Sequence, residues 1–348
     1  MLQICLKDDE PAGALTRVIA GGCDNAPMLD ILWVTTPFFA LILAGYWATR
    51  SGRLALAAIP GMNNFVLYFA LPCMLFRFGA TTDIAQLFNP TVVVLYTLVS
   101  LVMVAAAVGL TLSARVGWND AAMGALVAAF PNSGFMGVPL LVGLLGKTMA
   151  APVILTILID MVFTSSLCIA LSRLDGHGWR NVGPALRKAL SGVASNPMAW
   201  SILIGAGFSL GGWHLPVPVE KTVWMLADSA SPVALFTIGA VLARGQMNAT
   251  GHGHWDAIWS VVWLKLFLHP VLVLAFGLCA MQLGLPLDAS TLITLVLVAA
   301  LPSASNVSML AERFGADNAR IARIILATTV IAFGTFSLAV YVLTKGLV

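Results

Sequence analysis

Apolar stretches separated by short clusters of charged residues, glycine and proline make up almost the whole chain from Met28 onward. A helix needs roughly 20 apolar residues to cross the hydrocarbon core of a bilayer. Ten stretches approach that length, and the pattern predicts a membrane-spanning helix in each. They cover residues 29–49, 55–76, 91–114, 120–145, 149–172, 196–212, 219–243, 256–283, 289–312 and 319–344.

The composition indicates the same class of protein and excludes several others. Of the 348 residues, 59% are hydrophobic and only 9% are charged, whereas a soluble domain carries roughly 25% charged residues. Soluble enzymes, nucleic-acid-binding proteins and disordered scaffolds are therefore excluded, and a net charge of +3 is too small to indicate a polyanion partner. The five cysteines show no metal-ligand spacing, and no Gly-x-x-x-x-Gly-Lys-Ser/Thr loop occurs. We expect an all-α integral membrane protein without a metal site, a cofactor or ATP-driven pumping.

The first 27 residues differ from the rest of the chain. They are polar and contain no apolar core of signal-peptide length. An apolar stretch begins directly at Met28, so Met28 is an alternative start of translation. Whether residues 1–27 are translated stays open.

Lysine and arginine are unevenly divided between the two sets of loops. The loops after the first, third, fifth, seventh and ninth stretches hold eleven of them, against six on the opposite side, which includes both termini. Because basic residues concentrate in cytoplasmic loops, we predict that both termini face outward. The longest connection, residues 173–195, is then cytoplasmic, and residues 179–190 within it are typical of a short interfacial helix.

Two landmarks recur in the two halves of the chain. Residues 72–76 and 232–236 both read Pro-x-x-Leu-Phe, and residues 128–131 and 299–302 both read Ala-Ala-x-Pro. Matches at corresponding stretches five apart predict a duplication, with one five-helix repeat at 28–172, the connection 173–195 and a second repeat at 196–348. Since five is odd, the second repeat must be inverted, which is a construction plan of secondary transporters.

Proline interrupts the fourth and ninth stretches near the middle of the membrane. It removes a helical N–H, so we expect Pro131 and Pro302 to leave the carbonyls of Val127 and Val298 unpaired. Each break also exposes the N-terminus of its trailing half-helix, and two such positive ends favour a carboxylate. The alternative is a pair of kinks that only bend the helices. The predicted substrate-binding residues are the two prolines and the small residues after them: Pro131, Asn132, Ser133, Gly134, Pro302, Ser303, Ser305 and Asn306.

Few other ionisable residues lie inside the stretches, and intramembrane charges mark functional sites by default. The candidates are Asp160, Asp228, Lys265 and His269. Asp160 is the predicted coupling site for H⁺ or Na⁺; the alternative is a buried Asp160–Lys265 pair that only fixes packing, and Lys265 has the further alternative of reaching an interface.

The remaining polar and small residues suggest packing rather than chemistry. An intramembrane enzyme would need a convergent catalytic set, which these residues do not supply, so we do not expect an enzyme. Asn63 and Asn64 favour polar contacts between helices, and Gly207 and Gly211 form a small-xxx-small packing face.

Residues 130–141, with the sequence Phe-Pro-Asn-Ser-Gly-Phe-Met-Gly-Val-Pro-Leu-Leu, resemble a signature of the auxin efflux carrier family. This family includes plant PIN carriers and bacterial organic-acid carriers, and residues 72–76, 231–239, 265–270 and 300–315 agree with it. The resemblance implies ten helices in two inverted repeats. Broken helices 4 and 9 would cross in a transport domain that moves against a scaffold of helices 1, 2, 6 and 7. It also implies a substrate near Asn132 and positions around Asp160, and a homodimer.

Residues and resemblance together predict a secondary active transporter of small organic anions in the cytoplasmic (inner) membrane. Mono- or dicarboxylates such as malonate or malate would cross by an elevator-type movement, and short loops favour a bacterial carrier over a hormone exporter. The alternatives are a carrier of another anionic or amphipathic metabolite, such as an auxin-like weak acid or an amino acid, and a passive channel of the same fold. Substrate, direction of transport and coupling ion stay open.

Overall fold

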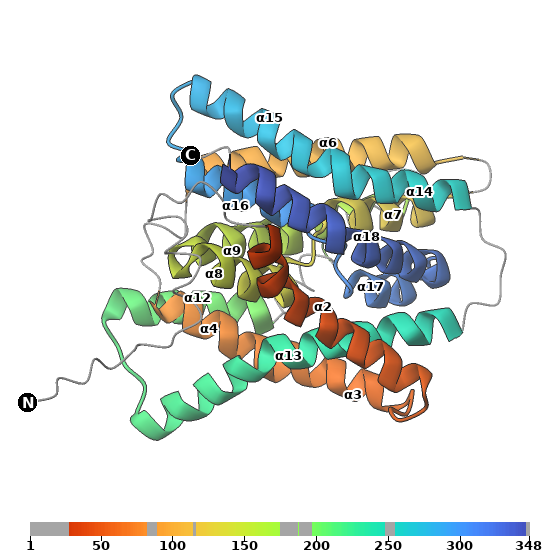
Figure 1. The fold of residues 1–348 in the computed structure, drawn as a ribbon. Coiled ribbons are helices and arrows are strands. Elements are labelled where there is room, and N and C mark those ends of the chain that lie inside the picture. Colours follow the sequence, from red (N-terminus) through yellow and green to blue (C-terminus); the bar gives the residue numbers. More distant parts are fainter. Residues whose placement is uncertain are drawn as a thin grey trace, which may run out of the picture.

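The computed structural model describes residues 28–81, 89–113, 116–174, 187, 197–247 and 255–345, which form helices joined by short loops (Figure 1). Within them the only β-type pairings are two isolated bridges, Ser113 with Val116 and Pro131 with Ser303. Most of the predicted connection 173–195, with its interfacial helix at 179–190, and the tail 1–27 lie outside the described residues.

The helices follow the apolar stretches in chain order. In the first half they are α2 (Met28–Arg50), α3 (Ala58–Phe65), η1 (Val66–Ala70), α4 (Leu71–Thr81), α6 (Pro90–Thr111), α7 (Trp118–Ala129), η2 (Ser133–Gly137), α8 (Val138–Leu145), η3 (Lys147–Met149), α9 (Ala150–Ile159), η4 (Asp160–Thr164) and α10 (Ser165–Leu171). In the second half they are α12 (Pro197–Gly211), α13 (Val217–Met247), α14 (Trp255–Trp263), η6 (Leu264–Leu268), α15 (His269–Gln282), α16 (Ala289–Ala300), α17 (Val307–Arg313) and α18 (Asn318–Lys345).

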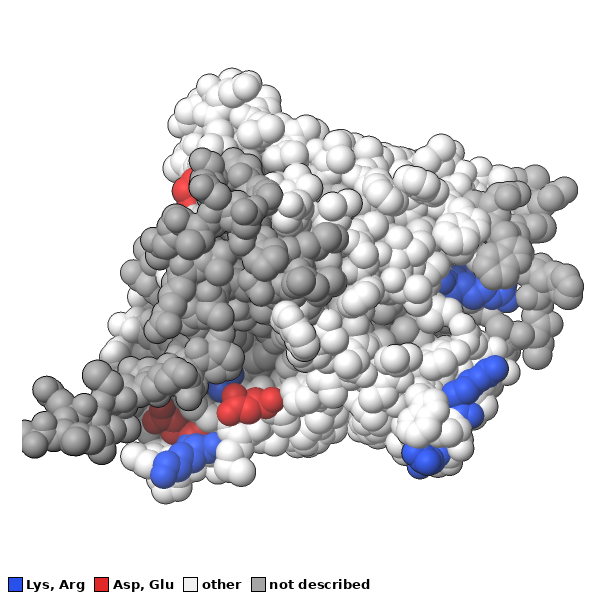
Figure 2. All heavy atoms as spheres, in the orientation of Figure 1, with Lys and Arg blue, Asp and Glu red and all other residues white. Residues whose placement is uncertain are grey.

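Six helices in the described residues are long and apolar enough to cross a membrane: Ala58–Thr81, Pro90–Thr111, Ala150–Leu171, Val217–Met247, Ile258–Gln282 and Asn318–Leu343. Three shorter apolar helices accompany them, at Ser133–Leu145, Trp200–Gly211 and Ala289–Ala300. The protein is therefore a multi-helix membrane protein, while ten spans in inverted repeats stay a prediction. On the face seen in Figure 2, a broad band without Lys, Arg, Asp or Glu separates charged groups near its two ends, as embedding in lipid requires.

Helices α2, α4, α12 and α13 form a group that packs through glycines (Figure 1). A Cβ at Gly79 of α4 would lie 2.8 Å from the carbonyl oxygen of Ile202 in α12, and one at Gly205 of α12 would meet the carbonyl of Phe76. In the other pair, Cβ atoms at Gly45 of α2 and Gly239 of α13 would also strike the backbone of the partner helix. Small residues let backbones approach this closely, so the four helices form a tight unit.

These glycines carry the same spacing as the sequence repeat. Gly45 and Gly205, and Gly79 and Gly239, are each 160 residues apart, as are Pro72 and Pro232. The α2–α13 contact thus corresponds to the α12–α4 contact when the halves are exchanged, which favours the predicted duplication. The predicted packing face on α12 is wrong in detail: a Cβ at Gly207 would meet nothing within 4 Å, and one at Gly211 would meet the ring of Trp213. The close approach uses Gly205.

Candidate functional site

The two proline breaks bind each other through the backbone. The N–H of Asn132 donates to the carbonyl of Pro302 (2.8 Å), and the N–H of Ala304 donates to the carbonyl of Phe130 (3.0 Å). Pro131 and Ser303 are paired as an antiparallel bridge between these bonds. Segments about 170 residues apart in the sequence therefore cross in the centre of the helix bundle, and the crossing itself satisfies part of the backbone that the prolines release.

The second break differs from the sequence expectation. The carbonyl of Val298 is not left unpaired by Pro302, because the N–H of Leu301 donates to it at 3.2 Å in a tightened last turn. Directly after Pro302, the N–H of Ser303 donates to the hydroxyl of Thr328 in α18 (3.3 Å), a partner that the local sequence does not indicate. Hydrogen bonds to distant segments therefore fix the geometry of the breaks, which differ in this from simple kinks that only bend a helix.

Two helix N-termini begin at the crossing, and no side chain caps either of them among the described residues. The first belongs to the continuous helix Ser133–Leu145, and the second to α17, Val307–Arg313, which has seven residues. Helix N–H groups and the helix dipole favour an anion, and a short helix contributes fewer aligned peptide dipoles. The Ser133 end is therefore the stronger of the two positive ends.

Several polar side chains at the crossing have no hydrogen-bond partner among the described residues. The side-chain amide of Asn132 forms no hydrogen bond there, and the buried Ser303 hydroxyl and the Asn306 side-chain oxygen are also unpaired. Ser133 is fully buried and donates weakly to the carbonyl of Pro131 (3.4 Å). Because an unpaired buried polar group costs about 1–3 kcal/mol, a ligand that supplied partners here would be stabilised.

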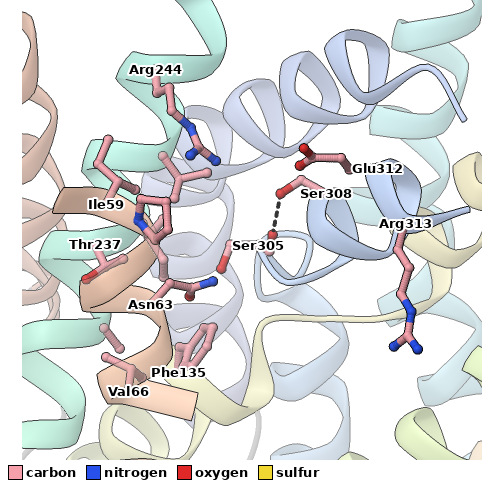
Figure 3. A pocket seen from close by; sticks show the side chains of 14 residues that line it. Ile59, Asn63, Val66, Phe135, Thr237, Arg244, Ser305, Ser308, Glu312 and Arg313 are labelled. Atoms are coloured by element: carbon pink, nitrogen blue, oxygen red, sulfur yellow. Dashed lines mark hydrogen bonds between the residues drawn. The ribbon is translucent and has the colours of Figure 1, made fainter. Parts of the chain in front are cut away.

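A cavity of about 400 Å³ lies beside the crossing (Figure 3). On one side it is bounded by α3, η1 and α13, and on the other by η2 and α17. Ser305 is the only predicted crossing residue that lines it. Its other polar lining residues are Asn63, Thr237, Arg244, Ser308, Glu312 and Arg313.

Most of these lining residues escaped the sequence interpretation. The sequence predicts that Asn63 contacts a neighbouring helix, and it places Arg244 among the eleven basic residues of the loops that orient the chain. A spacing signal did exist, because Thr237, Val241 and Arg244 share one face of a helix. What that face meets is decided by distant segments.

Asp160 is the centre of a second, fully buried polar cluster. Its carboxylate accepts hydrogen bonds from the hydroxyls of Thr164 (2.9 Å) and Tyr96 (3.3 Å), and its backbone carbonyl accepts one from Ser165 (2.8 Å). The π-helical turn η4 begins at Asp160, and such turns are frequent at functional sites. The carboxylate is thus held by hydroxyl donors contributed by α6 and the η4 turn.

Lys265 and His269 lie near this cluster and are also fully buried. The Lys265 ammonium is 3.0 Å from His269 Nδ1 and donates to the carbonyl of Ala299 (3.1 Å). Among the described residues Lys265 makes no ion pair with Asp160, and its burial means that it does not reach an interface. Ala299 is in the last turn before the second break, so Lys265 joins that turn to His269, whose ring centroid lies 6.0 Å from that of Tyr96.

Asp228 is not brought to either cluster. It forms an ion pair with Arg77 (2.6 Å) between α13 and α4, and its side chain is 69% exposed. Nothing in this placement groups it with Asp160, Lys265 or His269. Within the described residues no group of three His, Cys, Asp or Glu side chains is arranged to hold a metal ion.

Comparison with known proteins agrees with this architecture. A family model described as "Membrane transport protein" matches residues 33–177 and 184–342. The chain is 28% identical to the "Putative malonate transporter" of Rhizobium meliloti (strain 1021) over 324 residues, 92% of this chain and 98% of that protein. It is 27% identical to the "Uncharacterized transporter YfdV" of Escherichia coli (strain K12), covering 85% of this chain and 92% of that one. It is 24% identical to "Auxin efflux carrier component 8" of Arabidopsis thaliana, covering 72% and 82%.

Proposed function

The chain belongs to the membrane transport protein family that includes auxin efflux carriers, and from this premise we propose that it is a secondary active transporter of small organic anions. Mono- and dicarboxylates such as malonate or malate are the proposed substrates. One observation carries the proposal: two helix breaks bind each other and leave unpaired polar groups next to a cavity. Family membership indicates transport rather than catalysis.

The proposed carboxylate site is the crossing. The uncapped N-terminus at Ser133, the free amide of Asn132 and the unpaired groups of Ser303 and Asn306 offer the partners a carboxylate needs. These groups hold an anion mainly through dipoles and hydrogen bonds, so no lysine or arginine has to be buried at the crossing itself. A site of this kind can also let the anion leave again, which transport requires.

The cavity supports alternating access by an elevator-type movement. One of its walls includes α13, a member of the glycine-packed group α2, α4, α12 and α13, and the crossing segments lie on the other side. Tight backbone packing makes the first group a rigid scaffold, while the wall opposite is formed by side chains of η2 and α17. Movement of the crossing past this scaffold would expose the substrate to each side in turn.

We also propose that the protein lies in the inner membrane with both termini facing outward. Its two inverted repeats would span residues 28–172 and 196–348, and two copies would form a homodimer.

The Asp160 cluster is the proposed coupling site for H⁺ or Na⁺. Asp160 is surrounded by hydroxyl groups, and the nearby Lys265 reaches the end of α16 at Ala299. A change in charge at Asp160 would therefore act on Lys265 and, through it, on the helix that leads into the second break. This links ion binding to the conformation of the substrate site without direct contact between the two.

Uptake of radiolabelled malonate or malate into proteoliposomes tests the function. We expect saturable uptake, stimulated by unlabelled substrate inside, and a strong loss in Asn132→Ala. Asn64→Ala is the matched control, because Asn64 is an exposed asparagine on α3. Equal uptake by wild type and Asn132→Ala would remove Asn132 from the site, and uptake without stimulation from inside would indicate a channel.

A further inference from the structure

One face of α13 forms a continuous wall of the cavity. Ala234, Thr237, Val241 and Arg244 all line it, and their spacing of three to four residues places them on a single stripe. At a rise of 1.5 Å per residue, Thr237 and Arg244 are separated by about 10 Å along the helix axis. The stripe therefore passes from a small polar residue to a guanidinium group.

Arg244 is a half-buried cation without a partner among the described residues. Figure 3 shows its guanidinium directed from α13 into the space that Ser308 and Glu312 face from α17. In the described part of the chain it makes no hydrogen bond and no ion pair. Arg77, by contrast, is paired with Asp228, and Arg173 stacks over the ring of Phe314. Withdrawing a cation from water without a counter-charge is costly, so the position calls for an anion.

The other charges around the cavity do not supply that anion. Glu312 faces the same space, but it is exposed and forms no ion pair with Arg244 among the described residues. Water can solvate Glu312 where it stands. Arg313, the second arginine of the lining, points away from the space in Figure 3. Arg244 is thus the cation that a bound anion would meet.

The cavity adjoins the proposed carboxylate site through one residue of the crossing. Ser305 lines the cavity and belongs to the second break, whose partner Asn132 binds the carbonyl of Pro302. A molecule that extends from the crossing past Ser305 into the cavity would therefore meet hydrogen-bonding groups at the crossing and the cation Arg244 in the cavity. Its chemistry should match both, with one acidic group for each.

We propose that Arg244 determines specificity by binding the second acidic group of a small dicarboxylate whose first carboxylate lies at the crossing. This inference rests on the proposed function and names its substrate class as dianions rather than monoanions. The planar guanidinium suits a carboxylate because it can donate two parallel hydrogen bonds. A cavity of about 400 Å³ is large enough for such a ligand with accompanying water, since ligand sites measure roughly 300–1,000 Å³.

Binding measurements with two nearly identical ligands test the proposal. Malonate and its monomethyl ester have similar size, but at mildly alkaline pH the ester carries one negative charge instead of two. Isothermal titration of the purified full-length protein would give Kd for each ligand. We expect wild type to prefer malonate. Arg244→Gln should weaken malonate binding on the order of 10- to 100-fold, the loss typical of a charge-assisted hydrogen bond, while ester binding changes by less than about twofold.

Three further variants separate the possible causes of weaker malonate binding in Arg244→Gln. Arg53→Gln makes the same charge change outside the cavity, at an arginine that stacks on Trp47, and should leave both Kd values unchanged. Arg244→Lys keeps the charge without the planar fork and should fall between wild type and Arg244→Gln. Asn132→Ala should weaken malonate and ester alike. Thermal unfolding of each variant confirms that it is folded.

The outcomes distinguish this inference from the proposed function. If folded Arg244→Gln keeps the full preference for malonate while Asn132→Ala loses binding, Arg244 has no role in specificity and the carboxylate site stands. An equal loss of ester and malonate in Arg244→Gln also overturns the inference. If wild type binds neither ligand, the inference falls together with malonate as a proposed substrate.

Discussion

The contact between α4 and α12 offers a quantitative test of the scaffold. Gly205→Ala would place a Cβ against the carbonyl of Phe76, 3.0 Å from the nitrogen of Ala80 and 3.1 Å from Cα of Gly79. All three are backbone atoms, so no side chain can rotate away. By contrast, Gly207→Ala, two residues further along α12, adds a methyl group that meets nothing within 4 Å.

The size of the effect follows from the separation that the new methyl group requires. Carbon atoms in contact are normally about 3.5–4.0 Å apart, so the 3.1 Å approach to Gly79 must open by roughly 0.5 Å. A gap of this size forfeits about a quarter or more of the dispersion energy along the interface. Overpacking of this kind costs about 1–3 kcal/mol, whereas an alanine at the open position should stabilise the helix by up to about 1 kcal/mol.

Thermal unfolding in detergent, followed by loss of the monodisperse species, would compare the two variants. We expect Gly205→Ala to unfold at lower temperature than wild type and Gly207→Ala at the same or a higher temperature. Gly45→Ala, at the corresponding position of the α2–α13 contact, should behave like Gly205→Ala. Equal midpoints for Gly205→Ala and Gly207→Ala would refute the close approach of these backbones.

Three other predictions concern charged groups. Asp288 caps α16, and although partial burial favours its neutral acid, hydrogen bonds from Ser290 and Thr291 prevail and lower its pKa. The stabilisation of the folded protein by the ionised Asp288 is therefore complete above the unfolded-state pKa and is lost as the pH falls through the lower folded-state pKa. Thermal unfolding midpoints measured across pH should show this loss of stability in wild type. They should not show it in Asp288→Asn, whose side-chain amide can still cap the helix. Lys265→Met leaves the carbonyl of Ala299 without its donor and should lower the free energy of unfolding by about 1–3 kcal/mol; an unchanged denaturation midpoint would argue against that bond. A double-mutant cycle on Arg77 and Asp228 should give a coupling below about 1 kcal/mol, because the Asp228 side chain is 69% exposed to water, and a coupling of several kcal/mol would contradict this placement.

Much of the architecture was accessible from the sequence because the bilayer constrains local composition so strongly. A backbone in hydrocarbon must satisfy its own hydrogen bonds, so long apolar stretches become helices. Proline cannot continue that pattern, which located the breaks at Pro131 and Pro302. The repeated Pro-x-x-Leu-Phe and Ala-Ala-x-Pro segments pointed to a duplicated chain, and the residues around Pro131 pointed to the family that the comparison confirms.

What only the tertiary structure decided is which faces meet. Composition gave no sign that Gly205 rather than Gly207 touches another backbone, because the two differ only in their angle around α12. It did not show Arg244 directed into a cavity, Lys265 bonded to Ala299, or Asp228 paired with Arg77 instead of lying near Asp160. These facts depend on the relative rotation and position of helices far apart in the chain. A local apolar pattern specifies that a helix forms, while packing against distant segments specifies what its polar side chains contact.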